Sequence, residues 1–201
     1  FIHNNKLEYD YQGENSFRGG SGYRDFDIKS LRYYGKNIRN IEQKNIQGVK
    51  LYSVTLYNDN IKYTEEYKFK YDLNGKYVLS ISENKNKDTE GDYALVKFSL
   101  NTEKIESGDI YIYGELTNWN ILKEAKMTFN QKDKRYYGFL YLKQGYYNYQ
   151  YVINNNNIIK MMGGNYHETR NQYSIYVYYR PPWARYDRLV GLSKSTSNAL
   201  N

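Results

Sequence analysis

Few residues of this chain have the types and spacing that catalysis requires. His3 and His167 are the only two histidines, and they stand far apart, so a Ser-His-Asp triad would have to rely on one of them. Cysteine is absent, which excludes thiol catalysis, thiolate metal sites and disulfides. The sequence contains no phosphate-binding loop, dinucleotide-binding fingerprint, zincin motif or EF-hand loop. It therefore predicts no catalytic residue, no metal site and no cofactor.

A pair of carboxylates is the one catalytic alternative that stays open. A glycosidase needs only two carboxyl groups a few ångströms apart, and Glu115, Glu124 and Glu168 are available. Glutamates at the ends of strands are mostly solvated or in ion pairs, so these three residues favour a binding protein over an enzyme.

Aromatic residues concentrate in two stretches that suit recognition better than catalysis. The first is KQGYYNYQYV at 143–152, and the second is YSIYVYYRPPWARYDR at 173–188. Alternation places successive side chains on opposite faces of a β-strand. The tyrosines therefore either fill a core between two layers or present a rigid, hydrogen-bonding surface to a partner.

Candidate partner-binding residues lie near both ends of the sequence. Arginines alternate with glycines and aromatics in FRGGSGYRDFDIKSLR at 17–32, and a basic aromatic strip follows the two prolines at 181–182. Trp, Tyr and Arg dominate binding hot spots because they bury large areas at modest entropic cost. The candidates are Phe17, Arg18, Arg24, Arg32, Arg180, Trp183, Arg185, Tyr186 and Arg188. The alternatives are local pairing of Arg24 and Arg32 with Asp25 and Asp27, and a strip that covers its own sheet edge.

The distribution of charge also indicates a partner. The net charge is +7, and residues 140–201 hold seven basic but only two acidic residues. Such a segment suits nucleic acid, anionic lipid or an acidic protein surface. Because it has no dense run of Lys and Arg, an acidic protein is the least demanding of the three.

Period-2 patterning fills the sequence, and helical periodicity is nearly absent. Turn signals separate the strand candidates every 8–12 residues or so, as in β-sandwiches. A mean hydropathy of −0.92 leaves no apolar run long enough for a transmembrane helix. The strand candidates are 26–33, 37–44, 49–58, 64–71, 76–83, 92–100, 109–114, 124–130, 135–142, 146–154 and 173–180. The sequence predicts an all-β chain of two β-sandwich domains in tandem.

The predicted domain boundary follows from one charged stretch. Residues 83–91 (ENKNKDTEG) lack large apolar side chains and precede a strong strand. The expected divisions are an extended polar arm at 1–16, a first β-domain at 17–84, a linker at 85–91 and a second β-sandwich at 92–182. A basic aromatic strip and tail follow at 183–201, with residues 193–201 expected to be disordered.

Part of the second predicted domain resembles the glycogen- and starch-binding sandwich modules. The strand YIYG at 111–114 ends in Gly, Asn118-Trp119 follows in a turn, and a Gly-x-Tyr-x-Tyr strand begins at Gly145. The resemblance implies an Ig-like or glycogen-binding-module-like sandwich. It also implies that Trp119 stacks on sugar faces while Asn118 binds hydroxyls. The competing interpretation is that Trp119 and the alternate tyrosines fill the core.

A longer series of motifs resembles the plug proteins of the Bacteroidetes type IX secretion system. The series runs in order over about 17–191 through FRGG, RDFD, SLR, GDY, KQGYYNY, ET, YYR and RYDRL. The departures, Ser21-Gly22-Tyr23 and Arg170, affect surface detail. The resemblance also implies an upstream Ig-like domain that this sequence does not include.

That resemblance implies a non-enzymatic protein that closes the periplasmic end of a large outer-membrane β-barrel translocon by protein–protein contact. The protein would be periplasmic, peripheral to the inner face of the outer membrane, and monomeric within the hetero-complex. It would bind no cofactor and no nucleic acid, and would insert no segment into the membrane. The alternative function is a carbohydrate-binding module of a cell-surface glycan system.

Overall fold

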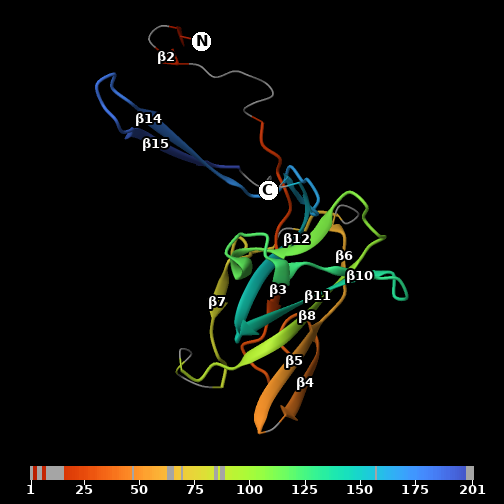
Figure 1. Cartoon of the computed structure of the whole chain (residues 1–201). Coiled ribbons are helices and arrows are strands. Elements are labelled where there is room, and N and C mark those ends of the chain that lie inside the picture. Colours follow the sequence, from red (N-terminus) through yellow and green to blue (C-terminus); the bar gives the residue numbers. More distant parts are fainter. Residues whose placement is uncertain are drawn as a thin grey trace. The chain divides into compact units, whose positions relative to one another are not determined.

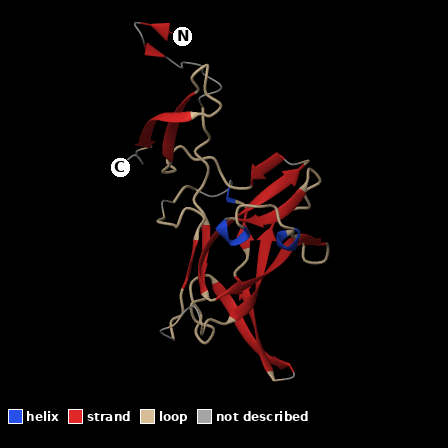
Figure 2. Cartoon of the chain, turned by 60° about the vertical axis from the view of Figure 1, so that its left-hand side comes forward, coloured by secondary structure: helices blue, strands red, loops and turns tan. Residues whose placement is uncertain are grey.

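The computed structural model describes residues 2–3, 6–7, 16–46, 48–62, 66–68, 70–83, 86, 89–156 and 158–197. None of these residues lies in an α-helix, and strands dominate the regular structure (Figure 2). The short 3₁₀ turns η2 (Glu115–Thr117) and η3 (Lys123–Ala125) interrupt the strands. The predicted all-β class is confirmed.

The chain divides into two compact units, which are described separately. One unit comprises Ser21–Gly164, and the other combines Phe1–Gly20 with Asn165–Asn201.

Two sheets build the Ser21–Gly164 unit (Figure 1). The first sheet has the order β10 (Thr128–Asn130), β11 (Arg135–Lys143), β8 (Tyr93–Asn101), β5 (Val49–Leu56) and β4 (Ile38–Ile46), with β6 (Asp59–Asn60) also paired to β8. The second sheet centres on β12 (Gly145–Asn155), which pairs antiparallel with β3 (Arg24–Asp27), β7 (Tyr77–Leu79), β9 (Asp109–Tyr113) and β13 (Ile158–Met161).

Strands from both sides of the predicted linker at 85–91 share both sheets. β5 pairs in parallel with β8 in the first sheet, and β3 and β7 both pair with β12 in the second. The predicted division into domains at 17–84 and 92–182 is therefore wrong, although the sandwich architecture is confirmed. A charged, turn-rich stretch is equally typical of a connection between two strands of one domain.

Alternating side chains from both sheets meet in one core. β8 buries Ala94, Val96, Phe98 and Leu100, and β12 buries Tyr147, Tyr149 and Tyr151. The Phe98 ring lies 5.6 Å from Phe26 of β3 and 5.1 Å from Tyr149, edge-on in both cases, so the two sheets pack face to face. The core interpretation of the tyrosine run at 143–152 is confirmed for these three residues, each 2% exposed.

The Asn165–Asn201 part of the other unit forms a long hairpin. β14 (Gln172–Tyr179) pairs antiparallel with β15 (Arg188–Thr196), and the register shifts between Val177 and Tyr178. The predicted disordered tail is wrong from 193 to 196, because those residues complete the ladder of β15. Residues 198–201 lie outside the described residues.

The predicted arm at 1–16 is described only in part. β1 (Ile2–His3) and β2 (Lys6–Leu7) form a short antiparallel pair. Apart from these strands and residue 16, the arm lies outside the described residues. Residues 66–68, 70 and 71 of the strand candidate at 64–71 form no strand, and the other residues of that candidate are not described.

Truncation of Phe98 tests the core. We expect Phe98→Ala to lower the free energy of unfolding by about 3–5 kcal/mol, because it removes the ring that joins the two sheets. The matched control is Phe139→Ala on the neighbouring β11, where the ring is 48% exposed; it should change the value by no more than about 0.5 kcal/mol. Urea unfolding of both variants measures the difference, and equal losses would contradict the packing described.

Candidate partner-binding surface

Arg24, one of the predicted partner-binding residues, is turned into the protein. Its Nε lies 3.2 Å from Asp59 Oδ1, its side chain is only 9% exposed, and its guanidinium also donates to the Asn60 carbonyl. Asp59 Oδ2 in turn accepts hydrogen bonds of 2.7 Å from the hydroxyls of Tyr149 and Tyr151. Arg24 therefore neutralises a carboxylate that anchors two core tyrosines. Its acidic partner is the distant Asp59 and not the neighbouring Asp25 or Asp27, as the alternative of local pairing had it.

The two tyrosines of this cluster stay protonated at neutral pH. Burial, the largest cause, raises the pKa of Tyr149 and Tyr151 well above the ordinary value, and the negative charge of Asp59 raises it further. Both hydroxyls therefore stay protonated and act as hydrogen-bond donors to Asp59.

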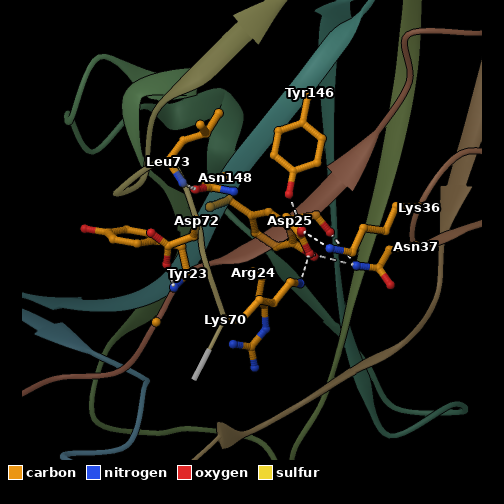
Figure 3. Close-up of polar contacts among 12 residues, drawn as sticks. Tyr23, Arg24, Asp25, Lys36, Asn37, Lys70, Asp72, Leu73, Tyr146 and Asn148 are labelled. Carbon is orange, nitrogen blue, oxygen red and sulfur yellow. Dashed lines mark hydrogen bonds and ion pairs between the residues drawn. The ribbon is translucent and has the colours of Figure 1, made fainter. Parts of the chain in front are cut away.

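Asp25 lies at the centre of a second polar cluster (Figure 3). Its side chain is 1% exposed, with Lys36 Nζ 2.7 Å from Oδ2 and Lys70 Nζ paired with Oδ1. The Tyr146 hydroxyl donates to Oδ2, and Asn37 Nδ2 donates to Oδ1 at 3.1 Å. Both carboxylate oxygens are thus fully used, so Asp25 connects parts of the fold and is not free for chemistry.

Two opposing effects act on the pKa of Asp25. Burial alone would raise the pKa of the carboxyl, but the hydrogen bonds from Lys36, Lys70 and Tyr146 outweigh burial and lower it. Burial and the bond to Asp25 raise the pKa of Tyr146 to about 12. At neutral pH the cluster therefore holds a charged carboxylate and a neutral phenol.

The motif RDFD at 24–27 is accordingly a packing motif. Phe26 is fully buried, and Asp27 Oδ1 accepts the backbone N–H of Lys29 at 2.9 Å. With Arg24 and Asp25 paired as above, each of its four side chains has an internal contact. Of the predicted partner-binding residues in the Ser21–Gly164 unit, Arg32 alone is exposed.

The other predicted residues lie in the second unit, most of them near the tip of the β14–β15 hairpin. Arg180 closes the tip with two bonds of 2.8 Å to the two carboxylate oxygens of Asp187. Trp183, which lies between Arg180 and Asp187 in the sequence, is 82% exposed. The Arg188 guanidinium lies 5.3 Å from the ring centroid of Tyr186 and donates to its hydroxyl at 2.9 Å. Arg185 is also exposed at the tip.

The segment that carries Phe17 and Arg18 joins the base of this hairpin. Phe17 and Arg18 are exposed, and the Phe17 ring lies 5.8 Å from Tyr173 at the start of β14. Asn171 Nδ2 donates to the Gly19 carbonyl at 2.9 Å. A Cβ on Gly19 would lie 2.0 Å from a backbone oxygen of Tyr166, so only glycine fits there. Phe17 and Arg18 are therefore in the same unit as the predicted C-terminal residues.

Both faces of the hairpin carry exposed apolar side chains. The register places Tyr176 and Tyr178 on one face beside Leu192 and Leu189, and puts Ile175, Val177 and Tyr179 on the other. These side chains are 50–62% exposed. Leu189 and Leu192 are functional candidates that the sequence analysis missed, because the serine-rich sequence after 192 was interpreted as a tail. The short apolar run LVGL at 189–192, bounded by Arg188 and Ser193, was the available signal.

The predicted sugar-binding pair, Asn118 and Trp119, follows η2 with positive φ angles of 50° and 57°. The Trp119 ring contacts Tyr23 at 6.2 Å and Tyr113 at 5.7 Å, both edge-on, and keeps 38% of its surface exposed. Trp119 thus packs at the surface rather than in the sandwich core. Its binding of sugar stays a prediction.

Two of the three glutamates considered for catalysis, Glu115 and Glu168, make other contacts. Glu115 Oε2 accepts the backbone N–H of Tyr77 at 2.9 Å, and His167 Nδ1 lies 3.2 Å from Glu168 at an exposed site. Within the described ranges, no three His, Asp or Glu side chains gather where they could hold a metal ion. The same part of the chain contains no helix long and apolar enough to cross a membrane.

Asp25→Asn tests the buried ion cluster. We expect it to lower the free energy of unfolding at pH 7 by about 1–3 kcal/mol, a value kept modest because Lys36 and Lys70 are 48% and 44% exposed. The folded-state pKa of Asp25 lies below the unfolded value of about 3.9, so its contribution is present above that value and is lost as pH falls through the folded-state pKa.

The difference in the free energy of unfolding between wild type and Asp25→Asn should therefore decrease as the pH is lowered from 7 to about 3, as measured by urea unfolding. Asp109→Asn is the control, because Asp109 is 54% exposed and pairs with the exposed Lys126. A difference that stays constant over this pH range would mean that the charge of Asp25 does not stabilise the fold.

Comparison with known proteins supports the fold and gives no information about the function. The crystal structure at 2.30 Å resolution of a hypothetical protein from Parabacteroides merdae ATCC 43184 is similar to this chain, with 36% sequence identity and a TM-score of 0.79. The similarity covers 89% of this chain but 45% of that chain, so this chain spans less than half its length. No protein-family model and no curated protein matches the sequence. The all-β architecture is thus shared with an experimental structure whose name carries no function.

Proposed function

We propose that this chain is a non-enzymatic protein-binding module that acts as the plug of an outer-membrane type IX secretion translocon. The observation that carries the proposal is the β14–β15 hairpin, which exposes apolar and aromatic side chains on both faces. A two-stranded hairpin is marginally stable in water by itself, and exposed apolar surface of this kind is typical of a binding site. A partner that covers both faces accounts for these features.

The identity of the partner rests on the ordered series of motifs over about 17–191. The motif RDFD forms β3, and KQGYYNY runs into β12, with which β3 pairs in the second sheet. The motifs YYR and RYDRL fall on the hairpin and its tip. The series thus includes both the scaffold and the proposed contact surface. The partner would be the periplasmic end of the large β-barrel translocon, which places the protein in the periplasm, against the inner face of the outer membrane.

The chemistry of the hairpin suits a contact that forms and is released. Arginine and tyrosine give a broad, partly polar interface, whereas the interface of an obligate complex is more hydrophobic. Residues 171–197 carry four basic residues and one acidic residue, so the complementary surface is acidic. Two copies of the hairpin would repel each other, which favours a monomer within a hetero-complex. A barrel wide enough for secreted proteins would leak when idle, so a removable stopper is mechanically required.

Removal of the hairpin tyrosines tests the proposal. The variant Tyr176→Ser with Tyr178→Ser keeps the ladder but removes both tyrosines from one apolar face, and we expect it to reduce co-purification of the translocon barrel from envelope extracts about tenfold or more. The matched control is Tyr33→Ser with Tyr34→Ser, a pair of tyrosines 74% and 61% exposed in the other unit. The control should recover as much barrel as wild type. Equal recovery with all three proteins would refute the proposal.

Charge reversal at the tip tests the acidic partner surface separately. Arg185→Glu with Arg188→Glu should weaken recovery of the barrel and make the remaining binding less sensitive to salt, because attraction to an acidic surface becomes repulsion. Lys44→Glu with Lys50→Glu, at exposed positions of β4 and β5, makes the same change in net charge elsewhere. If both variants lose binding equally, net charge and not the hairpin tip governs the association.

A further inference from the structure

We propose that the outward face of the first sheet binds a neutral, hydroxyl-rich polysaccharide in a groove over β10 and β11. This surface belongs to the Ser21–Gly164 unit and contains no residue of the hairpin. It is therefore independent of the proposed plug function.

Three aromatic side chains emerge in a row from the outward face of β11. Tyr137, Phe139 and Tyr141 alternate with the inward residues Gly138 and Leu140. Residues two apart on a strand are separated by about 6.6–6.8 Å, so the three rings are evenly spaced along the strand. Phe139 is 48% exposed and Tyr141 is 59% exposed.

Neighbouring side chains hold the outer two rings in place. Lys97 Nζ lies 4.4 Å from the ring centroid of Tyr137, and Tyr93 stacks on Tyr141 with centroids 5.2 Å apart and an interplanar angle of 16°. Among the described residues, no ring stacks on Phe139 between them. The row is thus ordered before any ligand binds, and its central ring is open to one.

An open groove of about 600 Å³ lies at the Tyr137 and Phe139 end of this row. Tyr137 and Phe139 line it together with polar residues of the preceding segment, among them Glu124, Thr128, Asn130 and Gln131. The volume falls within the range of roughly 300–1,000 Å³ that is typical of ligand sites. A floor of aromatic rings with a polar wall is the surface that a polysaccharide needs, because each sugar has an apolar C–H face and hydroxyls at its edge.

The polar wall favours a neutral chain over an anionic one. Glu124 offers an acceptor, Asn130 and Gln131 carry amides, and Thr128 can both donate and accept. Lys126 also lines the groove, but its Nζ is paired with Asp109 Oδ2 at 2.6 Å. Lys132 and Glu124, which both line the groove, carry opposite charges, so the lining has little net charge to attract a polyuronate. The groove therefore offers both hydrogen-bond donors and acceptors, as the hydroxyl groups of a neutral sugar chain require.

This site differs from the one that the sequence predicted. Asn118 and Trp119 follow β9 and η2 and do not line the groove. Trp119→Ala therefore separates the two locations experimentally.

Isothermal titration calorimetry of the whole chain against soluble neutral polysaccharides tests the proposal, with starch, mixed-linkage β-glucan, xyloglucan and galactomannan as probes. We expect saturable binding to at least one of them. Phe139→Ala should weaken it about three- to tenfold, and Phe139→Ala with Tyr141→Ala should weaken it further. Tyr33→Ala, which removes a ring 74% exposed elsewhere in the unit, and Trp119→Ala should both bind as wild type does.

Three results would overturn the proposal. One is the absence of binding to every neutral polysaccharide tested. Another is binding that Trp119→Ala abolishes and Phe139→Ala leaves intact. The third is binding confined to a polyuronate and lost at about 1 M salt, where the Debye length is about 3 Å, because simple attraction to a basic protein would explain it. Urea unfolding of Phe139→Ala shows whether the variant is folded, so a loss of binding cannot be confused with a loss of structure.

Discussion

Two carboxylates, the buried Asp25 and the partly buried Asp59, fix the position of β12, and the rest of the sandwich depends on that strand. A charge removed from water must be paired and hydrogen-bonded, or it destabilises the fold. Asp25 meets this need through Tyr146 on the outward face of β12, and Asp59 meets it through Tyr149 and Tyr151 on the inward face. β12 is thereby held from both sides. It then pairs with four other strands of the second sheet.

This arrangement determines which residues are left for recognition. The tyrosines of β12 that first suggested a binding platform form the core or bond to carboxylates, and Arg24 is enclosed with Asp59. Exposed aromatic surface instead lies on the β14–β15 hairpin and on the outward face of β11. The first surface is basic and two-sided, which suits a protein partner. The second is a rigid row of rings beside a polar groove, which suits a sugar chain.

The all-β class and most strands could be predicted because alternation is a local signal. β8, β11 and β12 each lie within about two residues of their predicted bounds. The domain boundary could not be predicted from the sequence, because it depends on the parallel pairing of β5 with β8. Such non-local pairing leaves no trace in composition. The same reason applies to Arg24, whose partner Asp59 is 35 residues away in the sequence. For β15, the serines and threonine at 193–196 resemble a disordered tail, and only the ladder to β14 makes them a strand.

The central claim is that recognition depends on the hairpin while β12 serves the fold. Hydrogen–deuterium exchange of the whole chain, free and bound to the purified translocon barrel, tests it most directly. The account predicts that amides of β12 exchange slowly in both states and that those of β14 and β15 become strongly protected on binding. Protection confined to the Ser21–Gly164 unit, with unchanged exchange in the hairpin, would contradict it.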